Sequence, residues 1–489
     1  MKFAIHWILL FHFSILIQVH SQDLPTIKIY GEATQYAGMT LVLESYSNFI
    51  SHEKTELAKI QVDAKGFFQT SIQLATTTYA FFDLGVFRAA AYLEPVKTYH
   101  LILPPYTPLK QADRFNPFFQ PQEVVLGIQN SDAADLNQQI RDYDDLFFQQ
   151  YNANAILLFN QNNEKLAAQI QTQLDSVFPP DKGSLSFQTH RFYREAKIKL
   201  LVKKRQKRHL IYSLFTSQPV GYSFPAYWDA FNELFKDFFP SYLSSSQGKP
   251  LKQAFTANAT FDTLSTAMAS DSLFKSDQLR ELVLLKALYD AFYSGRTDEE
   301  AVIQRIAEAT KTCSTNENRE IATQLVNRIT RLRVGTPAPN WIAITASGKE
   351  KELNDYKGKF VYLNFMNTQN FTCKKDLQTL TSISRDFKRE VEVVTVLTDD
   401  DPESAFNYMK KNGYKWDIVH FSQQGKILMD YSIKIEPSYF IIDPEGNFIK
   451  SPAPGPEENF REILLDILMN YKRKNIRKQG DKQKSIYDI

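Results

Sequence analysis

One short stretch, residues 359–376, limits more than any other what this chain can fold into. It reads KFVYLNFMNTQNFTCKKD and begins with an apolar run of β-branched and aromatic residues, Phe360–Phe365, which is typical of a buried strand. A polar patch, Asn367–Asn370, follows the run. Apolar residues then recur at the spacing of a helix, at Leu377, Leu380, Ile383 and Phe387. The sequence predicts a buried strand that leads directly into the N-terminus of a helix.

The junction between such a strand and helix is a common place for reactive groups in α/β folds. The first N–H groups of a helix have no partner inside the helix, and together with the helix dipole they stabilise an anion. In this chain the junction holds Asn370, Phe371, Thr372 and Cys373. These four residues are therefore the first candidates for a functional site.

The same stretch resembles the active-site segment of the TlpA-type exported thiol–disulfide oxidoreductases, which are thioredoxin-like, AhpC/TSA-related proteins. In that family a strand ending in Phe-Trp precedes a Cys-x-x-Cys motif at the start of a helix. Phe365, Thr368 and Cys373 match this pattern, and Cys373 takes the place of the second cysteine. Asn370 stands where the first cysteine would be. The resemblance implies a thioredoxin-like domain with a degenerate Cys-x-x-Cys motif.

The missing cysteine changes the chemistry that the resemblance implies. In the family the first cysteine attacks a substrate disulfide as a thiolate, because the helix N-terminus lowers its pKa, and the second cysteine resolves the mixed disulfide. Asn370 neither ionises nor attacks, and it is instead a favourable helix N-cap. Met366 and Gln369 also replace the tryptophans of the family. We therefore expect no two-cysteine redox cycling, and Cys373 remains as the candidate catalytic residue.

Two further motifs extend the resemblance over residues 334–472. Val334–Trp341 is similar to the Gly-x-x-Ala-Pro segment that opens TlpA-type domains and peroxiredoxins. Ile433–Asp443 is similar to a second family element, in which a proline, here Pro437, follows a cis peptide bond and its loop offers backbone groups to an extended peptide. A helix from Pro456 to about Tyr471 completes the predicted domain.

The rest of the chain predicts two more domains, because 489 residues exceed what one core supports. From residue 22 to 108, short alternating or β-branched runs recur between turns, which predicts an antiparallel β-sandwich. From 109 to 333 the apolar period becomes helical and predicts an α-helical middle domain. The α/β thioredoxin-like domain follows, and residues 473–489 are a basic tail. The expected fold class is therefore multi-domain, with sheets first, helices in the middle and an α/β domain last.

The N-terminal residues 1–21 have the pattern of a secretory signal peptide. One lysine precedes an apolar run, Phe3–Val19, and small residues follow it. Polar residues interrupt the run, and it is short for a membrane span. No later segment is apolar enough to cross a bilayer, so no transmembrane segment is expected after cleavage. We expect an exported protein of the periplasm or cell envelope of a bacterium.

Charged residues give little reason to expect a nucleic acid, a metal or another cofactor. The formal net charge is only +2. Two basic runs, residues 203–208 and 472–484, are typical of a solvated helix face and a solvated chain end, and the alternative is an anionic surface such as a membrane or a polysaccharide. Asp399–Asp401 are expected to cap a helix rather than to bind a metal.

The sequence leaves two functions open. The first is a non-catalytic binding or interaction module of the cell envelope, with a protein or peptide as its partner. The alternative is an active thiol oxidoreductase or peroxidase that relies on Cys373 alone or together with a partner's thiol. Cys313 is the other cysteine of the chain. A disulfide between the two cysteines and a pair of buried free thiols are both compatible with the sequence.

Overall fold

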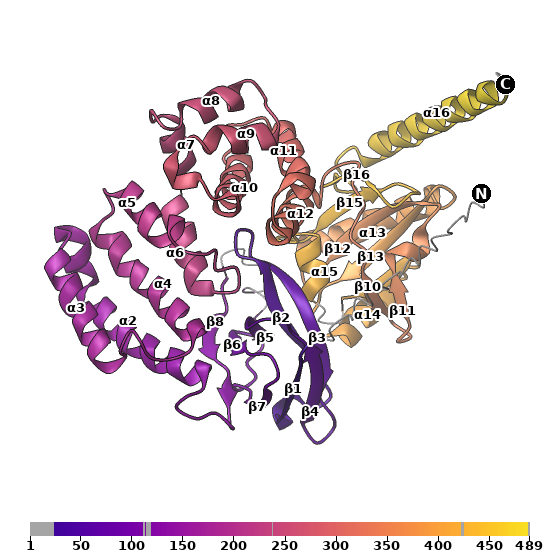
Figure 1. Cartoon of the computed structure of the whole chain (residues 1–489). Helices are drawn as coiled ribbons and strands as arrows, with labels where there is room; N and C mark the ends of the chain where they lie inside the picture. The colour runs from indigo at the N-terminus through magenta and orange to yellow at the C-terminus, as the bar shows by residue number, and fades with distance from the viewer. Residues whose placement is uncertain (1–23, 111–112, 114–118, 237, 422–424, 488–489) are drawn as a thin grey trace, which may run out of the picture.

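The computed structural model describes residues 24–110, 113, 119–236, 238–421 and 425–487. Three regions follow one another along the chain: two β-sheets, a group of helices, and an α/β domain (Figure 1). This order confirms the predicted fold class. The predicted signal peptide, residues 1–21, lies outside the described residues. No helix among those described combines the length and the apolar character that crossing a bilayer requires.

Two β-sheets that share one apolar core form the N-terminal region. Side chains such as Ile29, Phe82 and Tyr99 fill this core, because alternate residues of each strand face it. The sheet orders are β4-β1-β7-β9 and β3-β2-β5-β6-β8. Most neighbours are antiparallel, as predicted, but β1 pairs with β7, and β6 with β8, in parallel. The strands are β1 (Thr26–Glu32), β2 (Thr40–Asn48), β3 (Glu53–Gln61), β4 (Phe67–Gln73), β5 (Thr78–Leu84), β6 (Phe87–Leu93), β7 (Thr98–Ile102), β8 (Gln122–Val125) and β9 (Gly127–Ile128).

The middle region is helical. Most of its longer helices begin at a side chain that accepts a hydrogen bond from a first-turn N–H, as Asp135, Ser276 and Thr315 do. The main helical core is rich in aromatic side chains, among them Trp228 and Phe231. The helices are α2 (Leu136–Gln161), α3 (Glu164–Val177), α4 (Leu185–Val202), α5 (Lys207–Ile211), α6 (Pro225–Phe235), α7 (Phe238–Leu243), α8 (Lys249–Thr256), α9 (Phe261–Met268), α10 (Asp277–Tyr293), α11 (Glu299–Thr312) and α12 (Asn316–Thr330).

The hairpin between β2 and β3 joins the sheets to the helices. Its tip residues Phe49 and Ile50 are buried in the helical core rather than in the core of the sheets. The Phe49 ring stacks on Trp228 with 5.7 Å between centroids, and Asn232 Nδ2 donates to the Phe49 carbonyl at 3.0 Å. Figure 1 shows the hairpin reaching away from its own sheet toward α12. The two regions therefore share a core at this point.

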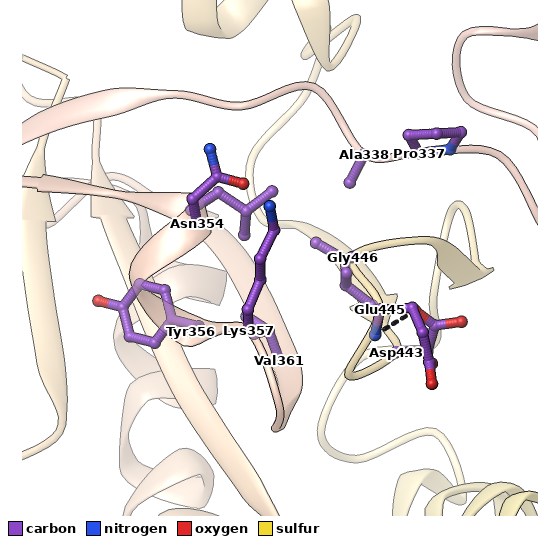
Figure 2. Close-up of a pocket in the computed structure, with 11 residues that line it drawn as sticks. Pro337, Ala338, Asn354, Tyr356, Lys357, Val361, Asp443, Glu445 and Gly446 are labelled. Atoms are coloured by element: carbon purple, nitrogen blue, oxygen red, sulfur yellow. Dashed lines mark hydrogen bonds between the residues drawn. The ribbon is translucent and has the colours of Figure 1, made fainter.

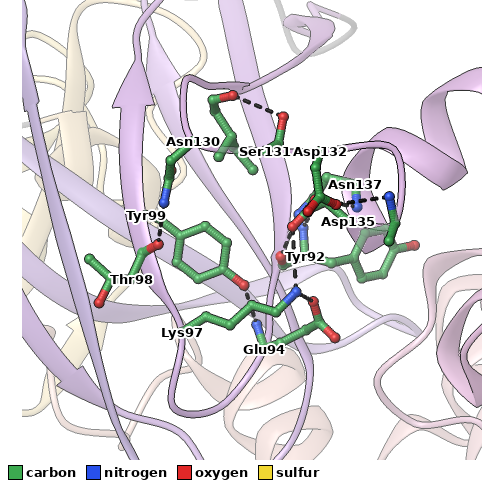
Figure 3. Close-up of polar contacts among 12 residues, drawn as sticks. Tyr92, Glu94, Lys97, Thr98, Tyr99, Asn130, Ser131, Asp132, Asp135 and Asn137 are labelled. Atoms are coloured by element: carbon green, nitrogen blue, oxygen red, sulfur yellow. Dashed lines mark hydrogen bonds and ion pairs between the residues drawn. The ribbon is translucent and has the colours of Figure 1, made fainter.

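A second connection ties the end of β6 to the start of α2 (Figure 3). The Asn137 side chain accepts from the Tyr92 N–H at 2.7 Å and donates to the Tyr92 carbonyl at 2.9 Å, as a neighbouring strand would. Lys97 forms ion pairs with Glu94 and with Asp135, the N-cap of α2. Backbone groups left at the strand end and the first turn of the helix are satisfied together.

Arg331, just after α12, lies where the three regions meet. Its guanidinium forms an ion pair with Glu53 of β3 and another with Asp430 of the α/β domain, at 3.5 Å in the latter case. Arg328 also reaches Glu53, at 3.3 Å. One arginine therefore contacts carboxylates of both flanking regions.

The C-terminal region is a seven-stranded sheet with helices on its faces. The strand order is β11-β10-β14-β13-β12-β15-β16, in which β12 runs parallel to β13 and antiparallel to β15. Its elements are β10 (Ile342–Thr345), β11 (Glu350–Glu352), β12 (Phe360–Met366), α13 (Phe371–Asp386), β13 (Val391–Leu397), α14 (Pro402–Lys411), β14 (Asp417–His420), α15 (Gly425–Asp430), β15 (Ser438–Ile442), β16 (Phe448–Lys450) and α16 (Phe460–Tyr487).

Strand β12 is the predicted buried strand, and all seven of its residues are buried. Its side chains alternate between two cores: Leu363 and Phe365 pack with residues of α15, and Tyr362 and Met366 pack with residues of α13 and α16. A strand with apolar groups on both faces requires helices on both faces. This arrangement places the end of β12 and the start of α13 at one end of the central strands of the sheet.

The last helix differs from its predicted extent. The sequence predicts an end near Tyr471, whereas α16 continues to Tyr487 and extends beyond the sheet (Figure 1). The apolar residues that contact the sheet, such as Leu464 and Leu468, lie in its first turns. The sequence of the extension is rich in lysine, arginine and glutamine, which have a high helix propensity.

We predict that the β2–β3 hairpin stabilises the helical region. Phe49→Ala removes a buried ring from that core and should lower the free energy of unfolding by about 3–5 kcal/mol. Urea unfolding followed by tryptophan fluorescence measures the change. Phe67→Ala is the matched control, because the Phe67 side chain is 47% exposed. An equal effect of the two substitutions would contradict the prediction.

Candidate functional site

The predicted site residues come together where β12 ends and α13 begins. Asn370 is the N-cap of α13, and its side-chain oxygen accepts from the Thr372 N–H at 2.8 Å and from the Cys373 N–H at 3.3 Å. Two of the orphan N–H groups of the first turn are satisfied in this way. Asn370 therefore serves as the structural cap of the α13 N-terminus.

The other end of the Asn370 side chain reaches the loop that contains Pro437. Asn370 Nδ2 donates to the carbonyl of Glu436 at 2.9 Å. The peptide bond between Glu436 and Pro437 is cis, as the resemblance implied. One side chain therefore joins the helix start to the proline loop, which the sequence places more than sixty residues apart.

Threonine and acidic side chains fix the backbone around this contact. The Asp399 carboxylate accepts from the Thr368 N–H at 3.0 Å and from its hydroxyl. The Thr398 hydroxyl donates to the carboxylate of Glu436, and His420 Nε2 donates to the Asp399 carbonyl at 2.8 Å. Because Asp399 is buried and its oxygens are engaged, it holds the loop that follows β12.

Sequence reasoning identified only part of this network. Asp401 caps α14, as predicted for the acidic run, and accepts from the Glu403 N–H. Asp399, however, turns toward Thr368 and caps no helix. No local pattern distinguishes the two aspartates, since the partner of Asp399 is Thr368, which lies in the turn after β12 and is distant in sequence. Across the described residues, no group of three or more His, Cys, Asp or Glu side chains is arranged to hold a metal ion.

Cys373 lies inside the domain rather than on its surface. The side chain is buried, and its sulfur accepts a long hydrogen bond from the Asn367 N–H at 3.5 Å. Burial raises the pKa of the Cys373 thiol to about 12, and the nearby carboxylates of Glu436, Asp376 and Asp399 act in the same direction, whereas the N–H donor opposes them. At neutral pH the group is a thiol.

The two cysteines are free and buried, and they do not form a disulfide. Cys313 belongs to the helical core, beside Glu281, and burial raises its pKa as well. Cys373 belongs to a core of the C-terminal domain. The structure therefore favours the second of the two arrangements that the sequence allowed.

A buried acid pair lies one turn beyond Cys373, and sequence reasoning missed it. The Tyr439 hydroxyl donates to the carboxylate of Asp376, which is only 7% exposed. Burial raises the pKa of Asp376, and the hydrogen bond from Tyr439 opposes that shift. A signal for it was present in the sequence, because Asp376 is a charged residue on the same helix face as the apolar Leu377 and Leu380.

Two large apolar side chains are exposed beside the Asn370–Glu436 contact. Phe371, the first residue of α13, is 82% exposed, and Ile435, just before Glu436, is 73% exposed. Each of these two side chains is next in sequence to one partner of the Asn370–Glu436 hydrogen bond. Exposed apolar side chains that lie together can mark an interaction surface. This surface, Phe371 with Ile435, is called the site rim below.

A pocket of the C-terminal domain lies at the opposite end of the strands from this site (Figure 2). It is lined by Val361 at the start of β12 and Ile442 at the end of β15, together with Pro337, Lys357 and Asp443. Its volume is about 130 Å³, which is room for a few water molecules rather than for a peptide. The predicted site residues do not line it.

Comparison with known proteins finds similarity to one family in the same region. The AhpC/TSA family profile matches residues 334–451. The thiol-disulfide oxidoreductase ResA of Bacillus subtilis (strain 168) is 34% identical over 117 residues, which are 24% of this chain and 65% of that protein. ResA of Bacillus thuringiensis subsp. konkukian (strain 97-27) is 29% identical over 139 residues, which are 28% of this chain and 80% of that protein.

Among solved structures, a putative thiol-disulfide oxidoreductase from Bacteroides vulgatus is 21% identical. The match covers 28% of this chain and 97% of that chain, with a TM-score of 0.27. The chain thus spans slightly less than two thirds of the length of the first of the two ResA proteins.

We predict that Cys373 is unreactive in the native protein. Its pKa of about 12 lies well above the ordinary value, so thiolate at neutral pH should be roughly 1,000-fold scarcer than in the unfolded chain. Maleimide labelling followed by peptide mass spectrometry, with and without urea, measures this for each cysteine separately. The buried Cys313 serves as the internal control. Rapid labelling of Cys373 alone in native protein at pH 7 would contradict the prediction.

Proposed function

We propose that residues 334–451, which match the AhpC/TSA family profile and are similar to ResA-type thiol-disulfide oxidoreductases, form a binding module without the two-cysteine chemistry of those proteins. Its partner is a protein or peptide, and the exported chain works at the cell envelope. The observation that carries the proposal is the double role of Asn370, which caps α13 and holds the Glu436 carbonyl.

Disulfide exchange needs a thiolate that a substrate can reach. The attacking thiol must lie at the surface, with a lowered pKa, and a second thiol must be close enough to resolve the mixed disulfide. Asn370 supplies no thiol at the helix start. The one thiol nearby, Cys373, is buried with a raised pKa, and Cys313 belongs to the core of a different region. None of these features supports redox cycling within the chain.

Binding needs less than catalysis does. Phe371 and Ile435 are exposed apolar neighbours in sequence of Asn370 and Glu436. Hydrogen bonds of Asn370, Asp399 and Thr398 hold this contact in place. Burial of such a side chain contributes about 1.5–3 kcal/mol. A preorganised rim lowers the entropy that a partner's binding must overcome. The site rim is therefore the surface that we assign to the partner.

The alternative function, a thiol enzyme that relies on Cys373, requires the α13 start to open. The thiol would have to emerge from a position where Asn367 and the surrounding core cover it. Opening of the helix start would also have to break the Asn370–Glu436 hydrogen bond, which joins the cap of the helix to the proline loop. No described contact favours such an opening.

We predict that partner binding depends on the site rim. The double variant Phe371→Ser with Ile435→Ser should lose a partner captured by the wild-type chain from an envelope extract of its source, with at least tenfold lower recovery, because two apolar contacts are removed. Val177→Ser with Leu185→Ser is the matched control, since these side chains are 60% and 81% exposed on the helical region.

A Cys373→Ser variant completes the experiment. Recovery that is unchanged in this variant and lost in the rim variant supports a non-covalent binding module. Recovery that depends on Cys373, and that a reductant releases, would replace the proposal with the thiol enzyme. Equal recovery with the rim variant and its control would remove the rim from the proposal.

A further inference from the structure

The last turns of α2 expose an unusual amount of apolar side chain. Ile156 is 75% exposed, Leu157 is 45% exposed and Phe159 is 51% exposed, whereas Leu158 between them is fully buried. Ile156 and Phe159 are three residues apart, so they share one side of the helix. Apolar side chains on a helix normally face the core. Here only Leu158 packs into the core, and Ile156, Leu157 and Phe159 remain at the surface.

A basic run lies against the same end of α2. Lys204, in the segment between α4 and α5, donates to the Phe159 carbonyl at 3.1 Å, and its ammonium lies 3.9 Å from the centre of the Phe159 ring. Arg205 lies in the same segment and Lys207 is the first residue of α5, and both are exposed. The contact brings the predicted basic run of residues 203–208 beside the exposed apolar side chains.

Part of this charge is neutralised, and part is not. Lys203 forms an ion pair with Glu164 at 3.7 Å, and Arg208 forms a bidentate pair with Asp271. Within the described residues, Lys204, Arg205 and Lys207 have no carboxylate within ion-pair distance. We call the six residues Ile156, Leu157, Phe159, Lys204, Arg205 and Lys207 the α2-end patch.

We propose that the α2-end patch is a docking surface for a membrane that contains anionic phospholipid. Lysine and arginine beside an anionic lipid surface attract it, and exposed leucine, isoleucine and phenylalanine enter the boundary between headgroups and acyl chains. The combination decides the partner. A polysaccharide or a nucleic acid would match the positive charge but would offer no apolar phase for Ile156 and Leu157.

The place of the patch in the fold is compatible with this role. The ends of α2 and α4 and the start of α5 belong to the side of the helical region that is remote from the α/β domain (Figure 1). The patch and the site rim therefore belong to different regions of the chain. The inference does not depend on the function proposed for the α/β domain, because no residue is shared.

Co-sedimentation of the full mature chain with lipid vesicles tests the proposal. The wild-type chain should bind vesicles that mix phosphatidylglycerol with phosphatidylcholine, and should bind phosphatidylcholine alone weakly. Arg205→Gln with Lys207→Gln removes two free charges without touching Phe159, and should weaken binding to the mixed vesicles roughly 20-fold. Lys410→Gln with Lys411→Gln, two exposed lysines of α14, is the matched control and should bind as the wild type does.

The apolar half of the patch has its own variant and signal. Ile156→Gln with Leu157→Gln keeps the helix propensity and should weaken binding while leaving the basic side chains in place. Ile156→Cys carrying an environment-sensitive fluorophore should shift to the blue on mixed vesicles and stay unshifted with dextran sulfate. The shift together with loss of binding in both patch variants would support the proposal.

Three results would overturn it. The first is undiminished vesicle binding by both patch variants, which would assign any membrane affinity to another part of the chain, such as its basic C-terminal end. The second is that the Ile156→Gln, Leu157→Gln variant binds mixed vesicles as tightly as the wild type does, and binds dextran sulfate as tightly as the wild type does. That result would indicate that charge alone drives the binding. The third is an absence of binding by the wild-type chain.

Discussion

The complete burial of β12 is the constraint on which the C-terminal domain depends. Because all seven residues are buried, helices must cover both faces of the sheet. The polar turn that leads to α13 therefore comes after the last buried residue of the strand. That turn places Asn370 at the start of α13. The antiparallel neighbour β15 begins with Ser438, which pairs with Phe365 near the end of β12. The Pro437 loop therefore lies at the same end of the strands as the start of α13. The geometry of the site therefore follows from the position of one strand.

At this end of the strands, Asn370 is the structural N-cap of α13. A thiol at the helix N-terminus would be activated by the N–H groups that Asn370 instead satisfies. An N-cap of this kind stabilises a helix by about 1 kcal/mol. The same amide holds the carbonyl of Glu436, and so one residue orders the helix start and the proline loop together. In the proposed function, the absence of two-cysteine chemistry and the fixed surface both follow from Asn370.

Much of this domain could be predicted from the sequence, since it depends on local patterns. The apolar run of β12 and the cap at Asn370 are read directly from neighbouring residues. The contacts that join distant segments could not be read in this way. Asp399 resembles Asp401 in sequence, and only the fold turns it toward Thr368. Likewise, nothing around Phe49 indicates that a strand hairpin completes the helical core.

The most direct test of the central claim is the rate of insulin disulfide reduction with dithiothreitol. The wild-type chain should not exceed the rate of dithiothreitol alone. Asn370→Cys places a thiol three residues before Cys373 on the same helix face, so the pair should form a disulfide on oxidation and give measurable reduction. Rapid reduction by the wild type that Cys373→Ser abolishes would contradict the claim. A variant that forms no internal disulfide would contradict the assignment of Asn370 to the attacking position.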